Sequence, residues 1–167
     1  MTISEVLLLD LDSEMAKTRQ ILELVPEDKA TWKPHAKSME LGALARQVAQ
    51  LPFFGARFLT SDSMDASGGP PPFTFVSKAD LFTTLDASEA ALKTALTAAS
   101  DEYLQGTWEF RAGDKVLYAA PRALLYRTMF LNHWVHHRAQ IGVYLRLLDV
   151  PIPGLYGPSA DAPWRPE

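Results

Sequence analysis

Four long stretches of the chain carry apolar residues at steps of three and four, and this period limits what the chain can fold into. Side chains at that spacing line up as one stripe along a helix. Proline-rich breaks at Pro26, residues 67–72 and Pro151 separate or end the stretches, because proline cannot continue a helix. The pattern predicts an all-α fold, an antiparallel four-helix bundle, with helices at residues 2–25, 39–60, 77–99 and 121–148.

Residues near the ends of these stretches support the same interpretation. Thr2 and Glu5 have the spacing of a capping box, in which each side chain accepts from a free backbone N–H. Ser77 opens the third helix in a similar way, and Ser38 is expected to cap the second. Pro52 lies inside the second helix and is expected to kink it or split it in two.

Residues 107–119 show a different pattern, with alternating apolar side chains on both sides of Gly113-Asp114. This alternation predicts a short β-hairpin before the fourth helix, laid over one end of the bundle. Residues 61–76 are interpreted as a loop. The sequence has no internal repeat and no domain linker, so residues 1–167 are expected to form a single domain.

Composition narrows the function classes. The net charge is -4, and no run of Lys or Arg is available to follow a phosphate backbone, so no nucleic-acid partner is expected. The absence of cysteine excludes disulfides, thiolate metal ligands and a cysteine nucleophile. The first residues lack a signal-peptide pattern and no apolar run is long enough for a membrane span. The chain is therefore expected to be soluble and cytoplasmic, with no membrane partner.

The fourth helical stretch places two histidines, His133 and His137, on its apolar stripe. At a spacing of four, their Cβ atoms should lie about 5–6 Å apart on one face, which suits two imidazoles binding one metal ion. Gln140 falls near the same face, His136 on its edge and Arg138 well off it. A structural polar network and a half-exposed pair are the alternatives. The full stripe reads Tyr126, Phe130, His133, His137, Ile141, Tyr144 and Leu148.

Gln47 lies on the inner stripe of the second helix, between Leu44 and Leu51. A buried glutamine needs polar partners. If it points inward, its amide oxygen ligates a metal weakly or its NH2 group bonds a neutral imidazole. If the helix is rotated, Val48 points inward and Gln47 faces water. Amide oxygen is a poorer ligand than imidazole for zinc or nickel, so binding is expected to be weak or absent.

Several other side chains are weaker candidates. Tyr126, Tyr144 and Gln140 are candidate substrate-binding residues, with core packing as the alternative for the two tyrosines. His35, in the first connection, is interpreted as an exposed loop residue. The four tryptophans are expected to be packing residues, namely Trp32, Trp108, Trp134 and Trp164.

Two parts of the chain carry a family resemblance. The segment from Asn132 to Gln140, followed by Tyr144-Leu145-Arg146, Pro151-Ile152-Pro153 and residues 156–161, resembles the DinB family of DinB/YfiT-like metalloenzymes. Residues 34–46 also resemble the family's entry into its second helix. The match runs through the whole chain in order.

The resemblance implies a four-helix bundle, often a homodimer, that holds a divalent metal, commonly nickel or zinc, with three histidines. Two of these come from a His-x-x-x-His on the fourth helix, which His133 and His137 match. The third comes from the second helix, where this chain has Gln47. Relatives in the family include thiol S-transferases and a metal-dependent isomerase that acts on a thiol adduct.

Two functional hypotheses follow. In the first, the chain is a metal-dependent enzyme whose ion, at His133, His137 and Gln47, activates water or a thiol for hydrolysis or thiol transfer on a small-molecule substrate. In the second, the chain is a metal-free dimeric bundle that serves as a small-molecule binding or stress-response scaffold. Homodimerisation, through an exposed apolar helix face, is expected in both.

Overall fold

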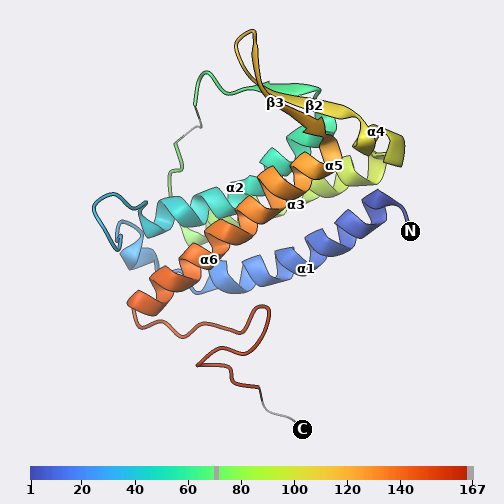
Figure 1. Ribbon diagram of the computed structural model, residues 1–167. Coiled ribbons are helices and arrows are strands. Elements are labelled where there is room, and N and C mark those ends of the chain that lie inside the picture. The colour runs from blue at the N-terminus through green and yellow to red at the C-terminus, as the bar shows by residue number, and fades with distance from the viewer. Residues whose placement is uncertain (70–71, 165–167) are drawn as a thin grey trace.

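The computed structural model describes residues 1–69 and 72–164 and shows a mostly helical chain with a small sheet at one end (Figure 1). Pro70 and Pro71, within the expected proline break, and the last three residues lie outside this description. The long helices are α1 (Ile3–Glu23), α2 (Leu41–Thr60) and α3 (Lys78–Ala98). A fourth helical rod runs without a break through α5 (Arg122–Leu125), the π-helical turn η2 (Tyr126–Leu131) and α6 (Asn132–Leu147).

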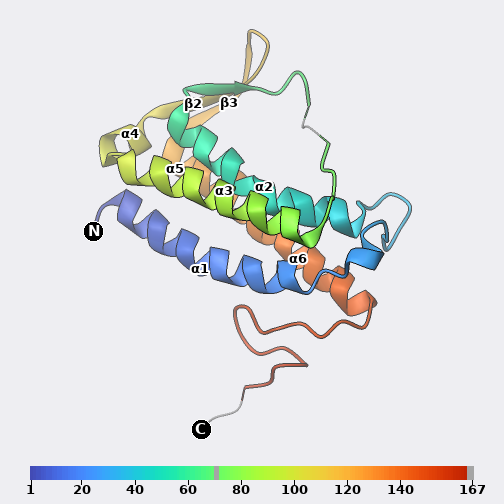
Figure 2. The ribbon, with the colours of Figure 1, turned by 180° about the vertical axis from the view of Figure 1, so that it is seen from behind.

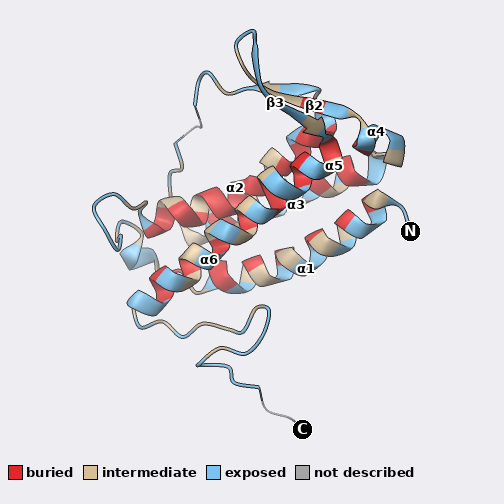
Figure 3. Cartoon of the chain, in the orientation of Figure 1, coloured by how far each residue is buried: buried red, intermediate tan, exposed pale blue. Residues whose placement is uncertain are grey.

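The long helices pack against one another around a shared apolar core. Helix α2 contacts α3 and α6, and α1 contacts the same two helices from the other side (Figures 1 and 2). Buried residues follow the inner faces of the helices, whereas the second strand of the hairpin, residues 115–121, and the C-terminal segment are largely exposed (Figure 3). No helix within the described ranges combines the length and hydrophobicity needed to cross a membrane.

The helix ends confirm two of the three expected caps. The Thr2 hydroxyl accepts from the Glu5 amide at 3.1 Å, and the Glu5 carboxylate accepts from the Thr2 amide at 2.7 Å. The Ser77 hydroxyl accepts from the Asp80 amide at 3.1 Å. The prediction for Ser38 is wrong, because α2 begins later, after Glu40.

Backbone carbonyls of the preceding connection take the place of a side-chain cap on α2. The amide of Leu41 donates to the Trp32 carbonyl at 2.8 Å, and that of Gly42 donates to the Ala30 carbonyl at 2.8 Å. This connection contains a short 3-10 turn, η1 (Glu27–Lys29). Free N–H groups at a helix start need partners of some kind, and here the chain itself supplies them.

Helix α2 continues through Pro52, so the proline does not split it. A proline removes the amide that would donate to the carbonyl four residues earlier, here that of Val48. The indole N–H of Trp134 donates to this carbonyl at 2.9 Å. A partner from α6 therefore compensates for the missing bond within α2.

The expected hairpin is present as β2 (Thr107–Ala112) and β3 (Lys115–Pro121), with Gly113 at a φ of 55° in the turn. A left-handed conformation of this kind favours glycine. A third strand, β1 (Ser63–Asp65), pairs in parallel with β2 and lies in the segment interpreted as a loop. A short helix, α4 (Asp101–Gln105), was also not predicted. The fold is thus mostly helical with a small three-stranded sheet, and not all-α.

The tryptophans divide between core and surface. Trp108 and Trp134 are fully buried, and the half-buried Trp32 packs against the core, as predicted. The packing prediction is wrong for Trp164, whose side chain is 79% exposed in the C-terminal segment. That segment turns back on α6 through an ion pair between Arg146 and Asp161.

Candidate metal centre

The inner face of α6 is rotated relative to the predicted stripe. Trp134 and Arg138 are fully buried, whereas His133 and His137 are half-buried at the edge of the core. The prediction that Arg138 lies off the inner face is therefore wrong. The π-helical turn η2 accounts for the change at the start of α6, because a π turn holds more residues than an α turn and shifts the phase of the residues that follow. Ile141 and Tyr144 of the predicted stripe are buried, as expected.

The structure brings together the three side chains predicted as metal ligands. The Nε2 atoms of His133 and His137 lie 2.7 Å apart, with ring centroids 4.5 Å apart. The amide nitrogen of Gln47 lies 3.1 Å from Nε2 of His137. Gln47 is 8% exposed, so the alternative in which it faces water is wrong. Its other amide atom, Oε1, is buried without a hydrogen-bond partner.

Gln140 determines which nitrogen of the His137 ring carries the proton. Its Oε1 atom lies 2.8 Å from Nδ1 of His137, and an amide oxygen can only accept. Nδ1 therefore carries the hydrogen, and Nε2 presents its lone pair to the cluster. The lone pair on Nε2 of His137 faces two nitrogens, one from His133 and one from Gln47. It can accept a hydrogen bond from only one of them.

Burial favours the neutral form of both rings, which is the form that binds metals. Burial lowers the pKa of His133, and a hydrogen bond to the Met129 backbone carbonyl offsets this only in part. Burial also lowers the pKa of His137, against a smaller upward effect of the bond to Gln140. Neutral imidazoles bind metal ions, and protonated ones do not.

The donor set fits a loosely held divalent ion. A cation between the side chains removes the conflict over the lone pair, and rotation of the Gln47 amide presents its unpartnered oxygen to that cation. Two imidazoles suit zinc or nickel, whereas an amide oxygen is a weak third ligand for either metal. Within residues 1–69 and 72–164, no group of three His, Cys, Asp or Glu side chains could hold a metal ion.

The two tyrosines predicted to bind substrate lie mainly in the core. Tyr126 is fully buried against Phe130, at a centroid distance of 5.0 Å, and its hydroxyl has no partner among the described residues. Burial raises its pKa, and the charge of Asp10 adds to this. Tyr144 is 9% exposed and its hydroxyl donates to the Met39 carbonyl at 3.3 Å.

Gln140 and His35 lie in different surroundings. Gln140 is the predicted substrate-binding residue that contacts a histidine of the cluster. His35 is exposed, as expected, and its Nδ1 accepts from the Lys37 amide at 3.1 Å.

Arg138 is a buried residue that joins three segments of the chain, which the apolar stripe of the sequence did not predict. Its guanidinium donates to the Glu14 carbonyl at 2.8 Å, to the Thr18 hydroxyl at 3.0 Å, and to the Glu14 carboxylate and the Tyr156 hydroxyl. Burial raises the pKa of Glu14, but hydrogen bonds from Tyr156, Arg138 and Lys17 together hold it below its ordinary value. This cluster joins α6 to α1 and to the C-terminal segment.

Comparison with known proteins agrees with this fold. The model of the DinB family matches residues 6–165. The crystal structure of a DinB-like protein from Bacillus subtilis superposes with a TM-score of 0.69 at 17% identity, covering 89% of this chain and 96% of the other. A DinB-like protein from Bacillus cereus gives a TM-score of 0.65 at 19% identity, covering 87% and 92%. A search of curated proteins found no match. The chain belongs to the DinB family.

Proposed function

We propose that this chain is a metal-dependent enzyme that acts on a small molecule and is built on an antiparallel four-helix bundle. The ion is held by His133, His137 and Gln47. The observation that carries the proposal is the approach of the two Nε2 atoms to 2.7 Å beside the unpartnered amide oxygen of Gln47. A buried polar atom without a partner is uncommon, and an ion between these atoms accounts for it.

The site suits activation of a nucleophile. A bound divalent ion lowers the pKa of a coordinated water or thiol, so hydrolysis and thiol transfer are the reactions proposed. Three protein ligands leave a coordination position for that molecule. Gln140 keeps the proton on Nδ1 of His137 and thereby directs Nε2 at the ion. Because both rings are half-buried, a small substrate can approach from the surface.

A specific observation favours a second candidate function. No set of three strong ligands exists within the described ranges, and one proton between the two Nε2 atoms would join the rings in a hydrogen bond without any ion. In that case the chain is a metal-free dimeric scaffold that binds a small organic ligand. A homodimer in the cytoplasm is part of both proposals, and light scattering on purified protein measures its mass.

Metal content separates the two functions. Protein purified without an affinity tag is dialysed to equilibrium against a saturating concentration of nickel or zinc, and the metal bound per chain is measured by mass spectrometry of the elements on both sides of the membrane. The enzyme proposal expects close to one ion per chain in the wild type and a large loss in His133→Ala. His35→Ala removes an exposed imidazole away from the cluster and should retain the metal. Metal-free wild type, or equal loss in both variants, contradicts the proposal.

A further inference from the structure

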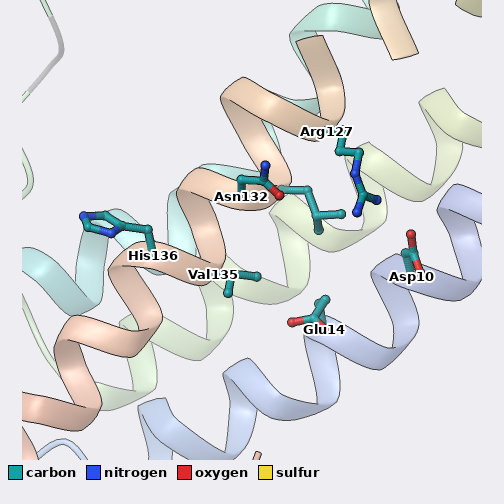
Figure 4. Close-up of a pocket in the computed structure, with 7 residues that line it drawn as sticks. Asp10, Glu14, Arg127, Asn132, Val135 and His136 are labelled. Carbon is teal, nitrogen blue, oxygen red and sulfur yellow. The ribbon is translucent and has the colours of Figure 1, made fainter. Parts of the chain in front are cut away.

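A cavity of about 480 Å³ lies between α1 and the rod formed by η2 and α6 (Figure 4). Its volume falls within the range of small-molecule sites, about 300–1,000 Å³. Leu131 and Val135 provide an apolar part of its lining. The cavity lining includes none of the three candidate metal ligands, although the ring of His136 in the lining lies edge-on to that of His137, with centroids 5.2 Å apart. Its polar lining residues are Asp10 and Glu14 of α1, Arg127 of η2, and Asn132 and His136 of α6.

Charges of opposite sign stand on opposite walls of this cavity. In Figure 4, Asp10 projects from α1 and Arg127 projects from η2 towards the same end of the cavity. Within residues 1–69 and 72–164, neither side chain has a hydrogen bond or an ion pair. The same holds for the side chain of Asn132. Glu14 differs, because its carboxylate is already bound by Arg138 and Tyr156. Asp10 is therefore the carboxylate available to a ligand.

The wall that carries Arg127 has an unusual backbone. Arg127 and Leu131 both belong to the π-helical turn η2, and such turns are frequent at functional sites. A π turn is less favourable than an α turn and persists where the surrounding structure requires it. Here it gives the phase that buries Trp134 and Arg138 and leaves Asn132 and Val135 on the cavity side.

The lining selects a ligand with two charges. An ammonium group fits Asp10, but a simple cation would also face Arg127. A carboxylate fits Arg127 and Asn132, but a simple anion would also face Asp10 and Glu14. A molecule with both groups and a short aliphatic part satisfies both walls and covers Leu131 and Val135. We propose that this cavity binds a small zwitterion, a free amino acid with an aliphatic side chain.

Three probes that share the isobutyl group of leucine test the charge requirement. L-leucine carries both charges, 3-methylbutylamine lacks the carboxylate, and 4-methylpentanoate lacks the ammonium group. Backbone amide spectra of the full chain are recorded by NMR as each probe is added. For L-leucine we expect shifts at Asp10, Arg127 and Asn132 with a Kd on the order of 1 mM. Each single-charge analogue should bind at least about tenfold more weakly.

Two substitutions test which residue binds each charged group of the ligand. Asp10→Asn should weaken L-leucine about tenfold and leave 4-methylpentanoate no weaker, because the ammonium partner is lost. Arg127→Gln should weaken L-leucine to a similar extent and leave 3-methylbutylamine no weaker. Asp114→Asn and Arg57→Gln are matched controls at exposed positions outside the cavity and should bind L-leucine as the wild type does.

Three results of these titrations would contradict the proposed amino-acid site. Absent shifts, unchanged binding in Asp10→Asn or Arg127→Gln, or equal binding of a single-charge analogue would each overturn the proposal. His133→Ala should keep L-leucine binding, because His133 is not part of the cavity lining. The experiment therefore gives its answer whether or not the histidine cluster binds a metal.

Discussion

The indole N–H of Trp134 donates to the backbone carbonyl of Val48 at 2.9 Å, and this is the carbonyl that Pro52 leaves without a partner in α2. The bond has two consequences. It allows α2 to continue through a proline, and it fixes α6 against α2 one residue after His133. The contact between Gln47 and His137 lies on the same pair of helices. Pro52, which was expected to kink or split α2, thus leaves free the carbonyl that joins α2 to α6 beside the candidate site.

Trp134→Phe should lower the free energy of unfolding by about 1–3 kcal/mol, because the Val48 carbonyl stays buried and loses its donor. The measurement is chemical denaturation, repeated in a Pro52→Ala background. Alanine restores an amide at position 52 that can donate to Val48 within the helix. The cost of Trp134→Phe should therefore be smaller in that background. If Trp134→Phe lowers the free energy of unfolding equally in the wild type and in Pro52→Ala, Trp134 and Pro52 are not coupled through this carbonyl.

Gln140→Ala should weaken zinc or nickel binding about 10–100-fold, as expected when the partner that orients a ligating imidazole is removed. The physical reason is that Nδ1 of His137 loses its acceptor, so the ring samples both tautomers and other orientations. Isothermal titration of metal into tag-free protein gives the affinity. Gln20→Ala, at an exposed position of α1, is the control and should leave it unchanged. An unaffected affinity in Gln140→Ala would show that Gln140 does not orient His137 for metal binding.

Gln47→His should raise the affinity for zinc or nickel by about tenfold or more, because imidazole is a better ligand than amide oxygen for these metals. Gln50→His places a histidine on the same helix, one turn away, and should produce a much smaller change. The same titration measures both variants. If Gln47→His binds metal no better than the wild type, the side chain at position 47 does not reach the ion.

Glu14 should make stability depend on pH in the acid range. Its pKa in the folded chain lies below the ordinary value of 4.5, so the unfolded chain binds the proton more readily. The stabilising contribution is complete above pH 4.5 and is lost as the pH falls through the lower folded pKa. Glu14→Gln should therefore lower the free energy of unfolding by about 3 kcal/mol near neutral pH, because Arg138 stays buried without its charge partner.

Thermal unfolding between neutral pH and pH 3 measures this effect. The difference in Tm between wild type and Glu14→Gln should shrink as the pH falls below about 4.5. Glu27→Gln, at an exposed position, should match the wild type throughout. A Tm difference that stays constant across the whole range would contradict the assignment of the effect to the Glu14 carboxylate.

The sequence was sufficient for those parts of the fold that depend on local signals. The three-to-four spacing, the caps at Thr2 and Ser77 and the turn at Gly113 each act within a few residues, and the structure has helices and a hairpin at those places. Strand β1 is different, because its three residues are too few to show an alternating hydrophobic pattern. They pair only with β2, which lies over forty positions later in the sequence. The sequence around Ser38 also gave no sign that backbone carbonyls cap α2.

The sequence predicted which residues form the candidate site, but it did not predict how the helix that carries the histidines is rotated. Gln47, His133 and His137 do meet, because a spacing of four keeps two side chains on one side of a helix whatever its rotation. The rotation itself depends on the π turn, which leaves no mark in the hydrophobic pattern. Arg138 was missed for the same reason, since its buried position and its bonds to Glu14 become evident only after the shift.

A cation shared by His133, His137 and Gln47 is the central proposal, and anomalous scattering locates such an ion directly. Crystals of tag-free protein soaked in zinc or nickel are measured above and below the absorption edge of the metal. We predict an anomalous peak between the two Nε2 atoms, with the Gln47 amide oxygen turned towards it. A map without a peak there, with the two rings still in direct contact, would contradict the metal centre.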